Sequence, residues 1–201
     1  MLDDCLENHA RCPNRMQRLL PTRVLDLRPT GQNESVKLYV SGNDEQGEYA
    51  ALSYCWGGAQ TFTTTKMTLN DRIHGIFLSG VAQTIQDAIL ATRALGIRYL
   101  WVDALCIVQD DFKDKVREIA AMGAIFRNAL VTIAATSSSN VHEGFLSARS
   151  PAQACLLPFT LPDGAFGTVS LVASDFQLLR DEPLNRRGWT FHKRMYCHHV
   201  C

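Results

Sequence analysis

The chain has 201 residues, of which 46% are hydrophobic and 20% are charged. Twenty acidic and twenty basic side chains give a formal net charge of zero, so no long-range field favours nucleic acid or an anionic membrane as a partner. No stretch approaches the roughly 18 apolar residues that span a bilayer, and the acidic N-terminus lacks an apolar targeting segment. We therefore expect one globular unit in the cytoplasm.

The seven cysteines do not suggest a disulfide framework, because their number is odd and two of them, Cys55 and Cys106, lie within apolar runs. A thiol in such a run behaves as a small hydrophobic side chain. A secreted scaffold held together by disulfides is not expected.

Two groups of cysteine and histidine leave a zinc-stabilised adaptor open as a lesser alternative. Cys5, His9 and Cys12 are separated by four and three residues, which places them on one face of a short leader helix within residues 1–22. Further ligands near the other end could come from Cys197, His198, His199 and Cys201. Neither group has the paired Cys-x-x-Cys spacing of common zinc sites, so we predict no metal.

The first half of the chain predicts a β hairpin followed by a buried strand. Residues 23–28 and 36–40 alternate apolar and polar side chains around the turn-forming residues 29–32, which indicates an added hairpin beside the main sheet. Residues 49–55 are mostly apolar and end at Trp56, Gly57 and Gly58, as expected for a core strand that must turn sharply.

Two helices then alternate with two strands. Apolar residues recur at helical spacing from Thr84 to Leu95, Gly96 supplies a stop, and residues 97–103 form a short β-rich run. A second helix is predicted over about 113–128, leading into a strand at 129–135. Its sheet-facing residues are expected to be Val116, Ile119, Ala120, Gly123 and Phe126. Glu118 is expected on the helix surface, paired with Lys115.

This order of elements predicts the α/β class, with a mostly parallel central sheet flanked by helices. Beyond Gly144 the pattern weakens, and residues 155–159 and 167–173 are predicted as strands around the turn at 162–164. A helical turn is expected at 176–179. Together these form a mixed C-terminal annex.

In such a sheet, ligands bind beyond the carboxyl ends of the parallel strands, where Ser53, Asp103 and Glu143 lie after successive strands. Asp103 either caps its loop or engages a ligand. Ser53 is either a buried strand residue or part of the cleft, and Glu143 is either an exposed loop residue or a catalytic carboxylate.

Trp56 and Gly57 offer a flat apolar wall with approachable backbone, suited to stacking a base or a nicotinamide, although a core tryptophan at a turn has the same sequence. Gln109 lies on the loop after the second core strand. The common phosphate-binding, dinucleotide-binding and metalloprotease motifs are absent from the sequence.

Several long motifs in order resemble the fungal heterokaryon incompatibility (HET) domain. The segment 49–57 (YAALSYCWG) is similar to the opening motif of that family, and 84–89 (TIQDAI) with 99–109 (YLWVDALCIVQ) is similar to its central motif. The likeness continues through Glu118, Met122 and Phe126 to 143–145 (EGF).

The resemblance implies a cell-death signalling module that associates with itself or with a protein partner, and a distant likeness to flavodoxin-like TIR domains. Some TIR domains cleave NAD, so the resemblance also implies NAD as a possible substrate. On that alternative Glu143, Asp103 and Ser53 form the catalytic group, and Trp56, Gly57 and Gln109 bind the ligand. No other cofactor is implied.

The resemblance divides the chain into the leader at 1–22, a HET core at 23–150 and the C-terminal part of the HET domain at 151–201. Residues 187–191 (RGWTF) resemble the closing motif, but His192 and Lys193 follow where the family usually has Gln-Glu. We expect this last part to be truncated relative to the family.

Overall fold

The structure is a computed structural model, and the parts that it describes are residues 18–28, 34–147, 154–162, 164–172 and 183–186. The cysteine and histidine groups near both termini, and the helical turn predicted at 176–179, lie outside these parts. Within them, no three His, Cys, Asp or Glu side chains form a group that could hold a metal ion. No helix among the described residues is long and apolar enough to cross a membrane.

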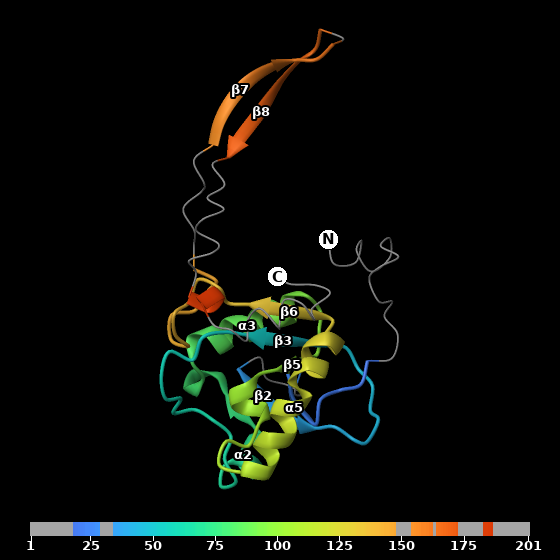
Figure 1. The fold of residues 1–201 in the computed structure, drawn as a ribbon, viewed down its shortest axis with the longest axis vertical. Helices are drawn as coiled ribbons and strands as arrows, with labels where there is room; N and C mark the ends of the chain where they lie inside the picture. Colours follow the sequence, from blue (N-terminus) through green and yellow to red (C-terminus); the bar gives the residue numbers. More distant parts are fainter. Residues whose placement is uncertain (1–17, 29–33, 148–153, 163, 173–182, 187–201) are drawn as a thin grey trace.

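The body of the protein is built on a six-stranded sheet with the order β4-β2-β1-β5-β3-β6 (Figure 1). Its strands, in chain order, are β1 (Arg23–Asp26), β2 (Ser35–Val40), β3 (Tyr49–Ser53), β4 (Ile76–Phe77), β5 (Tyr99–Trp101) and β6 (Val131–Ala134). Strand β3 lies between its two parallel neighbours, and all five of its residues are buried. A strand covered on both faces in this way reads as a continuous apolar run, as its sequence does.

The sheet is mixed, so the prediction of a mostly parallel sheet was wrong. Only β3–β5 and β3–β6 are parallel, and the other three of the five pairings are antiparallel. The predicted hairpin forms as β1 and β2, but it does not stand beside the sheet, because β1 pairs with the outer edge of β5 through Leu25 and Leu100. That contact joins residues far apart in sequence, and alternation of side chains carries no information about it.

Four α-helices accompany the sheet in the described parts of the chain: α2 (Leu69–His74), α3 (Gln83–Ala94), α4 (Asp103–Cys106) and α5 (Phe112–Asn128). Single 3-10 turns lie at Leu78–Gly80 and Pro183–Arg186. The predicted helices at 84–95 and 113–128 are confirmed as α3 and α5. Their crossovers run in opposite directions, β3 to β5 and β5 to β6, so right-handed connections place the two helices on opposite faces of the sheet.

Local signals set the ends of these helices. Gly96 adopts a φ of 74° just after α3, where a left-handed residue ends a helix at no steric cost to glycine. At the start of α5, the Asp111 carboxylate accepts hydrogen bonds from the amides of Lys113 and Asp114. Such caps satisfy amides that have no partner within the helix.

Helix α5 packs with a different face from the one predicted. Its buried residues are Asp114, Glu118, Ile125 and Phe126, whereas Val116 and Ile119 are 53% and 45% exposed. Gly123, expected against the sheet, has no atom within 4 Å of the place where a Cβ would be. The helix is turned because its two acidic side chains pair with an arginine of the sheet, a contact that apolar periodicity does not include.

Aromatic contacts tie the C-terminal half of α5 to the sheet. The ring of Phe126 meets that of Trp101 edge-on, with centroids 5.6 Å apart, and the Tyr49 hydroxyl donates to the Ile125 carbonyl at 2.6 Å. Cys55 and Cys106 are buried free thiols, as predicted. Burial raises the pKa of Cys106 to about 12, so this thiol stays protonated inside the core.

The chain before β1 is not helical where it is described. Over residues 18–22 the predicted leader helix is absent, and Leu19 instead forms an isolated bridge with Gln46. Arg18 reaches the end of α5, where it donates to the carbonyls of Asn128 and Ala129. A cation at a helix C-terminus complements the helix dipole.

The two strands predicted in the annex are confirmed as a second, two-stranded sheet. Strands β7 (Ala154–Thr160) and β8 (Phe166–Val172) pair antiparallel in register from Ala154 opposite Val172 to Thr160 opposite Phe166. This hairpin stands away from the six-stranded body (Figure 1).

Candidate functional site

The loops that follow the parallel strands β3 and β6 are in close contact. Gly57 has a φ of 76°, and a Cβ placed on it would lie 2.0 Å from the Cβ of Asn140. Only glycine fits there, because any side chain would overlap the neighbouring loop and would also strain the backbone. The convergence expected at this edge of the sheet therefore occurs, and the backbone of Gly57 is covered by Asn140.

Trp56 and Asp103 join the loop after β3 to the helix that begins after β5. The Trp56 Nε1–H lies 3.2 and 3.1 Å from the two carboxylate oxygens of Asp103. One of these oxygens also accepts from the Ala104 amide at 2.7 Å. The half-buried Asp103 therefore both accepts an amide of the first turn of α4 and holds the indole ring.

Gln109 stabilises the backbone of the loop after β5. Its side-chain amide donates to the carbonyls of Asp103 and Ile107 at 3.0 and 3.2 Å, and its own backbone amide donates to the Thr64 carbonyl. The structure thus places Gln109 next to Asp103, with its amide group used within the protein.

Ser53 is buried at the end of β3, with 2% of its surface exposed. Alternation along the strand places it on the same face as Tyr49, which contacts α5. Within the described parts of the chain its hydroxyl has no hydrogen-bond partner. Ser53 is therefore covered by protein.

Glu143 is exposed, and it closes its own loop. The carboxylate accepts from the Ser139 amide at 2.6 Å, from the Ser139 hydroxyl at 2.5 Å and from the Asn140 side-chain amide at 2.7 Å. The hydrogen bond from the Ser139 hydroxyl, with those from nearby amides, lowers the pKa of Glu143. An ionised carboxylate held in this way stabilises the turn that rests on Gly57.

Helix α3 anchors the same loop from below. The buried Asp87 accepts hydrogen bonds from the amides of Phe145 and Leu146 at 2.7 and 3.0 Å, and Thr84 accepts from the Gly144 amide at 3.3 Å. The sequence interpretation gave neither side chain a role in the site. An acid on the otherwise apolar face of the helix was the signal, since a buried carboxylate needs donors.

A buried charge cluster lies between β1 and α5, and it includes a residue expected on the surface. Arg23 contacts Asp114 at 2.5 Å and Glu118 at 3.8 Å, and Arg117 contacts both acids from the solvent side. Glu118 is 1% exposed, so its assignment as a solvated partner of Lys115 was wrong. The cluster balances two acids against two arginines, and it fixes α5 on the sheet.

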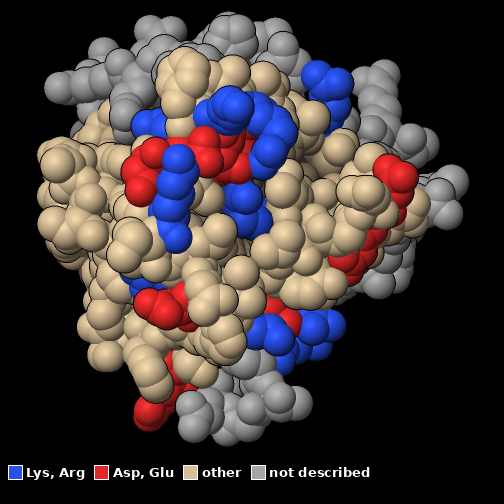
Figure 2. Space-filling model, turned by 90° about the horizontal axis from the view of Figure 1, so that it is seen from below, with Lys and Arg blue, Asp and Glu red and all other residues tan. Residues whose placement is uncertain are grey.

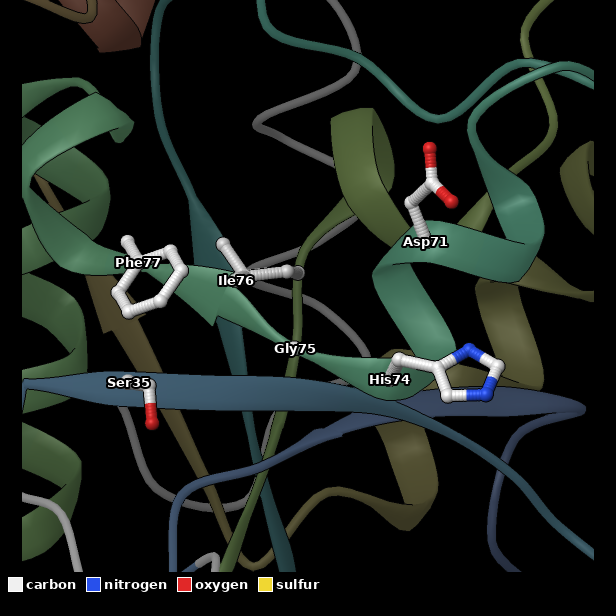
Figure 3. Close-up of a pocket in the computed structure, with 6 residues that line it drawn as sticks. All are labelled: Ser35, Asp71, His74, Gly75, Ile76 and Phe77. Carbon is white, nitrogen blue, oxygen red and sulfur yellow. The ribbon is translucent and has the colours of Figure 1, made fainter.

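A pocket of about 380 Å³ lies at the opposite edge of the sheet, around the end strand β4 (Figure 3). It is lined by Ser35, Asp71, His74, Gly75, Ile76 and Phe77. The His74 ring nitrogen Nδ1 lies 2.8 Å from the Asn70 carbonyl. None of the site residues predicted from the sequence lines this pocket.

Fold and site together define a mixed α/β domain in which the loops after β3, β5 and β6 are joined by Trp56–Asp103 and Gly57–Asn140 contacts. The family model described as heterokaryon incompatibility protein (HET) matches residues 49–192. Because this match covers well over half of the chain, the protein belongs to the HET family, and its role is related to heterokaryon incompatibility. Comparisons with curated proteins and with solved structures found no match.

Proposed function

We propose that this protein is a heterokaryon incompatibility signalling module that promotes cell death in the cytoplasm by associating with itself or with a protein partner. The observation that carries the proposal is the HET match over residues 49–192, which begins at β3 and includes Trp56, Asp103 and Glu143. The side chains of Trp56, Asp103 and Glu143 form hydrogen bonds within the protein, which suits a module that acts by binding other proteins through its surface.

Exposed apolar side chains support association. On α5, Phe112 and Val116 are 80% and 53% exposed, while the acidic residues of the helix, Asp114 and Glu118, point inward. On the face that Figure 2 shows, the largest group of charged side chains contains both acidic and basic residues, and smaller groups lie apart from it across uncharged surface. A surface without a dominant sign of charge favours a protein partner over nucleic acid.

The second candidate is TIR-like cleavage of NAD, with Glu143 as the catalytic carboxylate. Convergence of the loops that carry Trp56, Asp103 and Glu143 favours it, since ligands bind at such an edge. Two observations favour signalling instead: the Glu143 carboxylate is occupied by its own loop, and Ser53 is covered.

Inducible expression in yeast tests the signalling proposal, with colony survival as the measurement. We expect the wild-type protein to kill, and the folded Glu143→Gln variant to kill to the same extent, with His142→Gln as the control at the neighbouring exposed position. Survival of cells that express the folded wild-type protein contradicts the proposal. Loss of killing in Glu143→Gln, with killing retained in His142→Gln, favours the second candidate, NAD cleavage, instead.

Incubation of the purified protein with NAD, followed by measurement of released nicotinamide, tests the second candidate. We expect no release above that of Glu143→Gln. The zinc-stabilised adaptor predicted as a lesser alternative is tested by elemental analysis of the folded protein, where stoichiometric zinc supports it.

A further inference from the structure

The hairpin β7–β8 has one apolar face that the described parts of the chain leave open. Cys155, Leu157 and Phe159 of β7 share this face with Gly167 and Val169 of β8, by strand alternation and register. Leu157, Phe159 and Val169 are 44%, 48% and 43% exposed. An isolated two-stranded hairpin is marginally stable in water, and a sheet of three or more strands with an apolar face is more stable, so the hairpin gains from additional strands.

The two edges of the hairpin differ in their ability to accept another strand. The Leu161 amide donates to the Ala165 carbonyl, and hydrogen-bonded pairs alternate from there, so Pro158 and Thr168 form a non-hydrogen-bonded pair. The backbone nitrogen of Pro158 therefore faces outward, and the β7 edge lacks a donor at that position. Proline at such a position blocks strand addition.

The β8 edge is complete. By the same alternation, Phe166, Thr168 and Ser170 direct their backbone N–H and C=O groups outward, and none of them is proline. The sequence from 154 to 172 contains one charged residue, Asp163, which precedes β8, so the edge has none of the lysines that protect exposed strands.

We propose that β8 pairs antiparallel with β8 of a second copy of this chain, forming a four-stranded sheet in the order β7-β8-β8-β7. A second copy fits because two-fold antiparallel pairing satisfies both edges reciprocally, and because a net charge of zero causes no repulsion between copies. The proline on each outer edge ends the sheet, so the product is a closed dimer with a doubled apolar face. This inference rests on the proposed function, since it names the surface through which self-association occurs.

Two matched proline variants of the full chain test the interface. Thr168→Pro removes an outward donor from β8, and Thr160→Pro removes an outward donor from the β7 edge, already interrupted by Pro158. We expect sedimentation equilibrium to show dimers for the wild type and Thr160→Pro. In Thr168→Pro two inter-copy hydrogen bonds are lost, one from each copy, which weakens dimerisation by roughly 100-fold.

Thermal unfolding of each variant checks that its six-stranded body is folded. The hairpin is not part of that sheet, so the substitutions in β7 and β8 should leave this transition unchanged. Ser170→Pro, on the same edge as Thr168, must weaken the dimer as well. A monomeric wild type overturns the inference, as does an equal loss in Thr160→Pro. The inference is also overturned if Val116→Lys on α5 loses the dimer while Thr168→Pro still dimerises, because α5 is then the interface.

The yeast growth assay separates this inference from the proposed function. If Thr168→Pro is monomeric and still kills, the β8 interface stands and self-association is not the trigger. If the wild type kills and Thr168→Pro remains dimeric, the β8 interface is wrong and the proposed function stands.

Discussion

The Trp56 indole donates to both carboxylate oxygens of Asp103, which lies 47 positions further along the chain. This contact holds the loop after β3 against the first turn of α4, beside the place where Gly57 meets Asn140. Trp56, predicted to stack on a ligand, thus also holds two loops of the candidate site together.

A double-mutant cycle measures what this contact contributes. Trp56→Phe keeps an aromatic ring without the donor, and Asp103→Asn removes the charge. Hydrogen bonds to charged groups contribute about 1.5–3 kcal/mol, and the half-exposed position of Asp103 lowers the expected coupling to about 1 kcal/mol. Urea unfolding of the two single variants and the double variant gives the value. Strictly additive effects would show that the two side chains are energetically independent.

The charge cluster predicts a large difference between two arginine substitutions. Arg23→Met leaves the carboxylates of Asp114 and Glu118 buried without their inner cation, which costs about 3–5 kcal/mol. Arg117→Met removes a side chain that touches the same acids but is 60% exposed, and we expect less than about 1 kcal/mol. Urea unfolding compares the two. Similar losses in both variants contradict the view that Arg23 fixes the helix.

Asp87 predicts a dependence of stability on pH. Burial acts to raise the pKa of Asp87, but hydrogen bonds from the Leu146 and Phe145 amides and from Gln83 outweigh it, so the pKa lies below its usual value of 3.8. A depressed pKa in the folded state stabilises the protein above the unfolded-state value, and this stabilisation is lost as the pH falls through the folded-state value.

We therefore expect the free energy of unfolding to be steady above about pH 5 and to fall below about pH 4, less steeply in Asp87→Asn. The difference between wild type and variant should shrink as the pH falls through that range, because the stabilisation by the ionised Asp87 is lost there. Urea titrations at several pH values measure it, with the exposed Asp71→Asn as the control for loss of a charge. Parallel curves for wild type and Asp87→Asn would rule out a contribution from this carboxyl group.

Two glycine-to-alanine substitutions should have opposite effects. Gly57→Ala forces a Cβ into Asn140 at a φ of 76°, and we expect a loss of more than about 2 kcal/mol. Gly123→Ala adds a methyl group to α5 where no atom lies within 4 Å, and a better helix former there should stabilise by about 0.5–1 kcal/mol. Thermal unfolding decides both, and a destabilised Gly123→Ala would restore the prediction that α5 packs with that residue inward.

The sequence by itself determined the elements whose signals are local. Apolar periodicity with Gly96 located α3, and the continuous apolar run located β3. Alternation located β1 and β2, and two short runs on either side of a turn-forming segment located β7 and β8. Convergence of the loops carrying Trp56, Asp103 and Glu143 also followed from strand order, because parallel strands end at the same edge. These features depend on neighbours within a few turns of the chain or on connectivity alone.

Tertiary structure alone decided what depends on pairing between distant residues. The Leu25–Leu100 register made the sheet mixed, and Arg23 turned Asp114 and Glu118 inward so that Val116 and Ile119 face outward. Periodicity assigns charged residues to solvent, because burying an unpaired charge is costly. A cation supplied from 91 residues away along the chain removes that cost, and no local pattern records it.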